Sequence, residues 1–349
     1  MYTIKKFGVL VSMIFLSLSY AMADSASAPG AYKLSFAPLT GILIGQSQEF
    51  LYKYPGKTQY ESQLLWDLKP LWYVGMSSDF GPRDPFARGG FIAAGSLKFG
   101  LPFKTGNIED RDWDDSRNDD LTNYSKHDAS SQNAIFADIS GGYSWPLNDF
   151  LALSVAGKFS YMYFSWMAED GYLQYATEDS SNPHQYNTSS IIYREVYGPG
   201  ILYTQHWFIF APVLSLNGKI NQLFSVSGNF SYTPLIYCTD RDDHLLPLLD
   251  TAGAYLAGGR TFTGYFPFGT YINGGASVTF SPLKTLDLEL SVSYMYITGL
   301  RGSTYVNING ISGFNYQDYV PGTFNQNYYD GGAGYSALDI QITAKILVF

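Results

Sequence analysis

Residues 284–297 read KTLDLELSVSYMYI, and this stretch has the clearest periodicity in the chain. From Leu286 to Tyr296 the even positions are apolar or aromatic, whereas the odd positions from Asp287 to Ser293 are polar or charged. A period of two residues predicts a β-strand with one apolar face and one polar face. The same pattern recurs in residues 151–163 and 224–232, so the chain is expected to be rich in two-faced strands.

Ten segments of this kind can be counted along the chain. They are centred near residues 45, 68, 96, 139, 157, 208, 230, 273, 291 and 342. The links after the fourth, sixth and eighth segments are short, whereas those after the third, fifth, seventh and ninth span about 25 to 35 residues. An even strand number with short turns on one side and long loops on the other predicts an all-β, ten-stranded antiparallel transmembrane β-barrel with long extracellular loops. One link, residues 75–90, is longer than a periplasmic turn should be.

The N-terminus has the features of a secretory signal peptide. Two lysines precede a short apolar run, and Ala21-Met22-Ala23 provides a small-x-small cleavage pattern. We therefore expect residues 1–23 to be a signal peptide and residues 24–349 to form one barrel domain. No later segment offers the roughly 18 consecutive apolar residues of a membrane helix, so membrane residence would have to use strands.

The charge balance limits the partners. Removing Lys5 and Lys6 with the signal leaves 19 basic and 30 acidic residues, a net charge of 19 − 30 = −11. Such a chain should repel nucleic acid and attract cationic peptides. Cys238 is the only cysteine, which excludes an internal disulfide, and we interpret it as an ordinary small apolar residue.

Two acidic clusters stand where strand patterns give way to polar sequence. They are Asp110-Arg111-Asp112 and the run from Asp240 to His244. Side chains at i and i+2 of an extended chain point the same way, so each cluster can direct its members at one cleft. Asp110 and Asp112 share the even phase of the polar side of their strand and should point inward. The even members of the second cluster share the apolar phase of Phe230, and they point inward only if a bulge near Pro234 reverses it.

The order of several short motifs resembles the omptin family of outer-membrane endopeptidases. The motifs are Gly45-Gln46-Ser47-Gln48-Glu49, Ser62-Gln63-Leu64 with Trp66, Asp110-Arg111-Asp112-Trp113, Ser125-Lys126-His127 and Asp240-Arg241-Asp242-Asp243-His244. Each motif alone is weak, but their order on a ten-stranded barrel with a signal peptide is specific, and the likeness covers most of the mature chain. The resemblance implies an aspartic-type endopeptidase in the outer membrane of a Gram-negative bacterium, with its active site facing outside.

The resemblance also implies roles for individual residues. It assigns catalysis to Asp110, Asp112, Asp242 and His244, and substrate binding to Glu49, Asp240, Asn123, Ser125 and His127. Water held between the two catalytic couples would attack the peptide carbonyl, and the acidic pair Glu49 and Asp240 would receive Arg or Lys before the scissile bond.

Other implications concern partners and departures from the family pattern. The partners are cationic peptide or protein substrates and outer-membrane lipid, and a monomer is expected. No cofactor is expected, although lipopolysaccharide is a candidate activator. Asn123 stands where some members have Asp, and His206 stands where an Arg is expected, so the preference after the cut and the lipid dependence are open.

Several alternatives compete with this hypothesis. Residues 110–120 could be only a solvated acidic loop. An EF-hand is excluded because residue 115 is Asp instead of Gly and residue 121 is Leu instead of Glu. Zinc on Asp242 and His244 lacks further ligands. Ser125 and His127 suggest a serine protease, although neighbours at i and i+2 rarely form the required hydrogen bond. A non-enzymatic adhesin that binds cationic peptides also stays open, whereas inward charges such as Lys98 and Asp138 argue against a diffusion pore.

Overall fold

The structure is a computed structural model that describes residues 32–52, 59–182, 184–245, 248–249, 255–257, 259–308 and 328–348. The expected signal peptide, residues 1–23, lies outside these residues. All regular elements in the described part are strands: β1 (Tyr32–Tyr52), β2 (Tyr60–Pro82), β3 (Gly90–Gly100), β4 (Lys104–Asp112), β5 (Asn123–Asn148), β6 (Leu151–Glu178), β7 (Tyr186–Lys219), β8 (Phe224–Thr233), β9 (Ile236–His244), β10 (Leu248–Leu249), β11 (Tyr255–Ala257), β12 (Arg260–Pro267), β13 (Thr270–Leu283), β14 (Leu286–Ile308) and β15 (Tyr328–Leu347).

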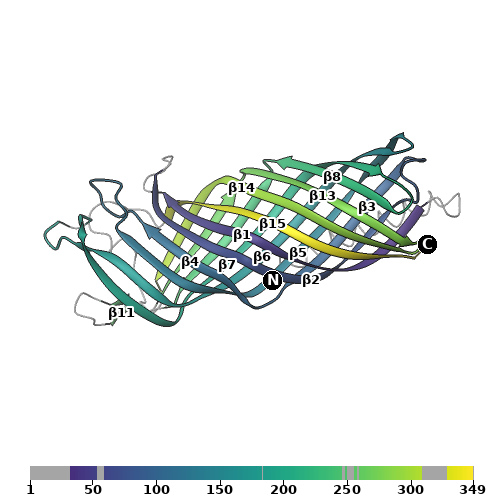
Figure 1. Cartoon of the computed structure of the whole chain (residues 1–349). Helices are drawn as coiled ribbons and strands as arrows, with labels where there is room; N and C mark the ends of the chain where they lie inside the picture. Colours follow the sequence, from purple (N-terminus) through teal and green to yellow (C-terminus); the bar gives the residue numbers. More distant parts are fainter. Residues whose placement is uncertain are drawn as a thin grey trace.

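These strands close into a ring. β3 and β4, β8 and β9, and β12 and β13 are each the two halves of one interrupted strand, because both halves pair with the same neighbouring strands. β10 and β11 form a separate two-stranded sheet. The described residues thus form a ring of ten antiparallel strands, which β1 closes by pairing with both β2 and β15. The predicted fold is confirmed, and Figure 1 shows the tilted strands of the elongated barrel.

The strands are longer than the alternation of apolar and polar residues predicts. Segments 104–112, 123–134 and 236–244, expected to lie partly in loops, form paired strand, which leaves shorter connections such as 113–122 and 179–185. Alternation requires lipid on one side; where both faces meet water, the pattern fades although the backbone ladder continues. The long link at 75–90 has the same explanation, since β2 runs to Pro82 and leaves a turn of residues 83–89.

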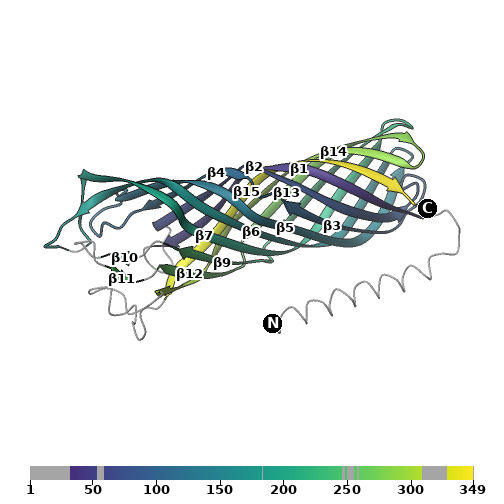
Figure 2. The same ribbon diagram turned by 90° about the horizontal axis from the view of Figure 1, so that it is seen from below.

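A belt of exposed apolar side chains surrounds the half of the barrel that holds the short turns. Its members include Phe36, Trp72, Val74, Phe91, Leu97, Phe99, Val155, Phe210, Leu214, Phe230, Tyr232, Val278, Leu290, Val292, Tyr294 and Ile342. On β3 the belt spans Phe91 to Phe99, which is about the 9 to 11 residues that a transmembrane strand needs. No helix within the described residues is long and apolar enough to cross a membrane. The turns and the C-terminus lie at the belt end, and β10 and β11 lie at the opposite end (Figure 2).

Charged side chains fill the lumen inside the belt. Lys98 pairs with Asp339 at 3.2 Å, Lys158 with Asp138 at 3.0 Å, and Lys345 with Glu289 at 3.1 Å. All of these residues except Lys345 line a polar cavity of about 410 Å³. The inward charges proposed from the sequence therefore form ion pairs inside the lumen.

An aromatic layer closes the lumen above this cavity. Its fully buried rings are Trp66, Phe164, Trp166, Tyr203 and Trp207. Trp66 stacks on Tyr203 with ring centroids 5.0 Å apart, and Phe164 stacks on Trp166 at 4.8 Å. Because these side chains come from β2, β6 and β7, they join opposite parts of the wall and form a floor for the upper barrel.

Three adjacent strands each carry one extra residue at the level just above the belt. Ile236 on β9 is five positions after Ser231 on β8, whereas their partners on β7, Ile209 and Val213, are four positions apart. The pairing of β8 and β9 with β13 and β12 keeps one register throughout, and so does the pairing of β12 and β13 with β14. β12 and β13 therefore carry their extra residue at Phe268, and β14 carries one at Gly299; both residues have positive φ. We call these two positions, together with Pro234 and Leu235 between β8 and β9, the bulge row. It reverses the phase: odd residues such as Ser231 face inward below it, and even residues from Ile236 upward face inward above it.

The bulge row predicts a specific pattern of cysteine reactivity. In a Cys238→Ser background, Tyr232→Cys and Arg241→Cys should both react rapidly with N-ethylmaleimide in detergent, although 232 and 241 have opposite parity. Ser231→Cys should be protected, because Ser231 is 4% exposed. Mass spectrometry of the alkylated protein measures the rates, and protection at 241 together with reaction at 232 would contradict the bulge.

Candidate active site

The first wall of the candidate site is β4, which directs Asp110 and Asp112 inward. Ser62 on β2 donates a hydrogen bond to Oδ1 of Asp110 at 3.5 Å. Burial raises the pKa of Asp110 to about 6, with Asp242 adding to the rise and His244 opposing it. Burial also raises the pKa of Asp112 well above its usual range, and the neighbouring charge of Asp110 adds to this effect. Burial and the neighbouring like charge therefore both favour the protonated form of this pair.

The second wall is β9, whose phase above the bulge row directs Asp242 and His244 inward. Nε2 of His244 donates a hydrogen bond to Oδ2 of Asp242 at 2.9 Å. Burial alone would lower the pKa of His244, but the Asp242 carboxylate outweighs burial and the net pKa is raised. Since Nε2 is engaged, Nδ1 is the nitrogen that can take a further proton. Oδ1 of Asp242 is buried and has no hydrogen-bond partner among the described residues.

The two walls lie close enough for their charges to interact, and we call the space between them the cleft. His244 and Asp242 both act on the ionisation of Asp110, and Glu49 on β1 interacts with Asp240, Asp242 and Asp110. Pairing over five strands therefore brings both acidic clusters to one opening, as the sequence predicts. Both lie on hydrogen-bonded strands, however, whereas the sequence places them where strands end.

Glu49 and Asp240 form an acidic pocket at the base of the cleft. Glu49 is 3% exposed, and its Oε2 has no hydrogen-bond partner among the described residues. Burial raises its pKa well above the usual range, and the charge of Asp240 adds to this. Burial likewise raises the pKa of Asp240 to about 7, although the hydroxyl of Tyr203 opposes the rise by donating to its Oδ2 at 3.0 Å. Two neighbouring buried carboxyls without a cation favour an incoming cationic group.

Residues that sequence reasoning missed hold Asp240 in place. Nε2 of Gln205 donates to the Tyr203 hydroxyl at 2.6 Å, and the Oε1 of Gln205 accepts from Ser47 and from Nε1 of Trp207 at 3.1 Å. Gly264 brings its backbone against Asp240; a Cβ there would lie 2.3 Å from Oδ1. In the sequence, these residues could be recognised only as polar side chains at positions of the strand pattern that face inward. Their contacts depend on the register between neighbouring strands, which the sequence does not give.

Ser125 and His127 lie on β5, which pairs with β4 and β6 at this level. The Ser125 hydroxyl donates to Nε2 of His127 at 3.1 Å, and Nδ1 of His127 donates to the Asp170 carbonyl at 2.8 Å. The expectation that these neighbours rarely bond is wrong here, because the Asp170 carbonyl orients the imidazole toward Ser125. Ser125 is only 2% exposed, and burial lowers the pKa of His127, so the Ser125 hydroxyl is shielded from solvent.

Asn123 lies beside Asp112 at the start of β5. Its Nδ2 donates to Oδ2 of Asp114 at 2.7 Å. The hydroxyl of Thr122 donates a hydrogen bond to the Asp112 carbonyl and accepts one from the Asp114 amide. Asn123 therefore joins the first wall to the loop that follows it.

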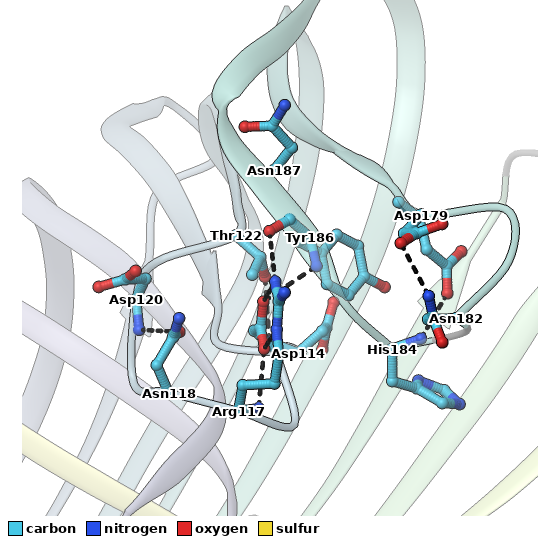
Figure 3. A network of polar contacts seen from close by, with 12 residues as sticks. Asp114, Arg117, Asn118, Asp120, Thr122, Asp179, Asn182, His184, Tyr186 and Asn187 are labelled. Carbon is cyan, nitrogen blue, oxygen red and sulfur yellow. Dashed lines mark hydrogen bonds and ion pairs between the residues drawn. The ribbon is translucent and has the colours of Figure 1, made fainter.

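The loop 113–122 is clamped to the tip of the β6–β7 hairpin. Asp115 is 1% exposed and receives Nε and Nη2 of Arg117 at 3.1 and 2.7 Å, and the Tyr186 amide at 2.9 Å. The hydrogen bond from Arg117 holds the pKa of Asp115 well below its usual range. Figure 3 shows the loop with Asp114 and Arg117 lying against the tip with Asp179 and Tyr186. The solvated-loop alternative does not describe this ordered network.

Metal binding finds little support in the described part of the chain. No group of three or more His, Cys, Asp or Glu side chains there could hold a metal ion. Asp242 and His244 bond each other, and Cys238 is buried beneath Asp240 on the same face of β9.

Comparison with known proteins gives three findings. The sequence model of the Omptin family matches residues 30–330. The plasminogen activator of Yersinia pestis is 27% identical over 332 residues, which cover 93% of this chain and 96% of that protein. The crystal structure of the outer membrane protease OmpT from Escherichia coli superposes with a TM-score of 0.68 at 17% identity, covering 90% of this chain and 96% of the other.

The clamp can be tested independently of any activity. Asp115→Asn removes the charge that holds Arg117 and should speed hydrogen exchange of the amides in 113–122 by about tenfold, the effect of losing a charged hydrogen bond. Hydrogen-exchange mass spectrometry measures this, with Asp120→Asn in the exposed part of the same loop as the matched control. Equal exchange in the two variants would show that the clamp does not order the loop.

Proposed function

The chain belongs to the omptin family and is an outer-membrane protease of a Gram-negative bacterium, and on that premise we propose that it cleaves peptide bonds next to basic residues. In this proposal, water held between the Asp110/Asp112 pair and the Asp242/His244 couple attacks the peptide carbonyl. The observation that carries the proposal is the opposition of these two couples across one cleft, with an acidic pocket at its base.

The two couples have complementary chemistry. His244 is oriented by Asp242 and can take a proton from water on Nδ1. The Asp110/Asp112 pair, which shares a proton, can hold the same water and donate a hydrogen bond to the oxygen of the tetrahedral intermediate. His244 then returns its proton to the leaving amine, which restores the starting state. No step requires a metal or other cofactor.

The acidic pocket supplies the proposed specificity. The side chain of Arg or Lys entering between Glu49 and Asp240 would satisfy Oε2 of Glu49, which now has no hydrogen-bond partner in the described residues. A guanidinium can pair with both carboxylates at once, and an ammonium can act as a point charge. Glu49 is therefore proposed to recognise the residue before the scissile bond together with Asp240. Asn123, Ser125 and His127 are proposed to shape the cleft: Asn123 at its wall, and the other two as buried support.

The orientation follows from the barrel. The C-terminus lies at one end of the barrel, and β9 and β12, which carry part of the site, lie toward the other end with β10 and β11 (Figure 2). We therefore propose that the cleft faces the outside medium and receives cationic peptides or proteins there. Lipopolysaccharide as an activator stays a proposal. The outward ring cluster of Tyr161, Tyr163 and His206 lies at the upper edge of the belt, where such a lipid would contact the wall.

The proposal predicts the effect of removing each couple. With a fluorogenic peptide containing Arg-Arg and with added lipopolysaccharide, His244→Ala and Asp112→Ala should each lower kcat by about 10² to 10⁴-fold, the usual effect of losing a general acid or base. Plasminogen, after which the Yersinia pestis relative is named, is tested in parallel as a protein substrate. Asp128→Ala, on an exposed part of β5, is the matched control. Cleavage unchanged in both variants would contradict the mechanism.

The proposal also predicts how pH changes substrate binding. Asp240, with a pKa of about 7, is neutral below that pH and charged above it, so KM for an Arg peptide should fall as pH rises from 6 to 8. kcat should rise as the pH passes through the raised pKa of His244, because His244 must lose its proton to act as base. Tyr203→Phe removes a donor that favours the Asp240 carboxylate and should move the KM transition to higher pH, whereas Tyr197→Phe, on an exposed part of β7, should not. A KM that rises with pH would count against the acidic pocket.

A further inference from the structure

Arg260 places a cation among the carboxylates of the cleft. It is the first residue of β12, whose register with β9 sets Thr261 opposite Asp243 and Phe262 opposite Asp242. The even residues of β12 face inward, since Gly264 and Phe266 are buried against Asp240. Arg260 therefore points into the cleft beside His244, on the neighbouring strand.

Contacts along this wall fix the position of the guanidinium. Its Cζ lies 5.9 Å from the centroid of the Phe262 ring, and that ring lies 5.3 Å from the His244 ring. The guanidinium is near enough to act on the charges of Asp112 and His244. Within the described residues no carboxylate lies at ion-pair distance from it, whereas four arginines elsewhere in the upper barrel, 111, 117, 241 and 301, each pair with one.

The height of Arg260 on the wall indicates which part of a substrate it meets. Asp240, Asp242 and His244 follow one another on one face of β9, and strands rise about 3.3 Å per residue. Asp240 in the acidic pocket and Arg260 beside His244 are therefore about 13 Å apart along the wall, with the Asp242/His244 couple between them. A peptide that puts its basic side chain in the pocket and its scissile bond at the couple extends toward Arg260 with the residues after the cut.

The opposite wall at this height carries the carboxyls of Asp112 and Asp114. Burial raises the pKa of Asp112 well above its usual range, which favours its neutral form, and Asp114 accepts the Asn123 amide. Tyr175 adds a hydroxyl near the same carboxyls. Among these side chains Arg260 is the cation, and its guanidinium is the group that an acidic residue after the cut would meet.

We propose that Arg260 is a specificity-determining residue that makes the protein favour an acidic residue, and disfavour a basic one, directly after the scissile bond. The inference rests on the proposed function, because it assumes that the basic residue enters the Glu49/Asp240 pocket. The proposed substrates are polypeptides in which Arg or Lys is followed by Asp or Glu. One wall of the site would then recognise a basic side chain before the cut and an acidic side chain after it.

Three peptides that differ only in the residue after Arg, namely Glu, Gln or Lys, test this directly. For each variant, kcat/KM for the Glu peptide is divided by kcat/KM for the Lys peptide. A general loss of activity lowers both values equally and leaves this ratio unchanged. The wild type should favour Glu by about tenfold, the effect expected from one charged hydrogen bond. Arg260→Gln should bring the ratio close to one, and Arg260→Glu should reverse it.

Arg241→Gln is the matched control, because Arg241 lies on the same wall but faces outward and pairs with Asp243 at 2.7 Å. Its ratio should equal that of the wild type. A wild type that cleaves all three peptides without preferring Glu, a preference that survives in Arg260→Gln, or an equal change in Arg241→Gln would overturn the inference. Failure of the wild type to cut after Arg in any peptide would instead refute the proposed function.

Discussion

The architecture depends on one constraint, which is that each backbone amide and carbonyl in the lipid layer needs a hydrogen-bond partner within the protein. β1 meets this constraint by pairing with β15 as well as β2, so the sheet has no edge inside the belt. The same ladder continues beyond the belt, where lipid no longer requires it, and carries β4 and β9 upward as rigid strands. The cleft is therefore built largely from strand positions that are fixed by register.

The bulge row adapts this regular ladder to a second environment. Below it the even residues of β8 face lipid, and above it the even residues of β9 face the cleft. One extra residue in each of three adjacent strands changes the phase without breaking the pairing among them. Asp240, Asp242 and His244 thus share one inward face because of a distortion several residues away, at Pro234 and Leu235.

Much of the fold and part of the site could be predicted from the sequence. Alternation in segments such as 284–297 located all ten strands, and parity correctly directed Asp110 inward, because lipid imposes a strong two-residue pattern. Strand ends could not be located, since that pattern disappears where both faces meet water. Contacts such as Gln205 with Tyr203, and the place of Arg260 beside His244, depend on the register between strands far apart in sequence. A single sequence carries no periodic signal for such register.

The aromatic layer has a consequence for permeability. Trp66, Trp166, Trp207 and Tyr203 separate the polar cavity within the belt from the acidic pocket above it. A hydrated solute or antibiotic that reaches the cleft meets a dry wall of rings, and the peptide fragments leave by the opening through which the substrate came. The bacterium can therefore carry many copies of this barrel without making its outer membrane leaky.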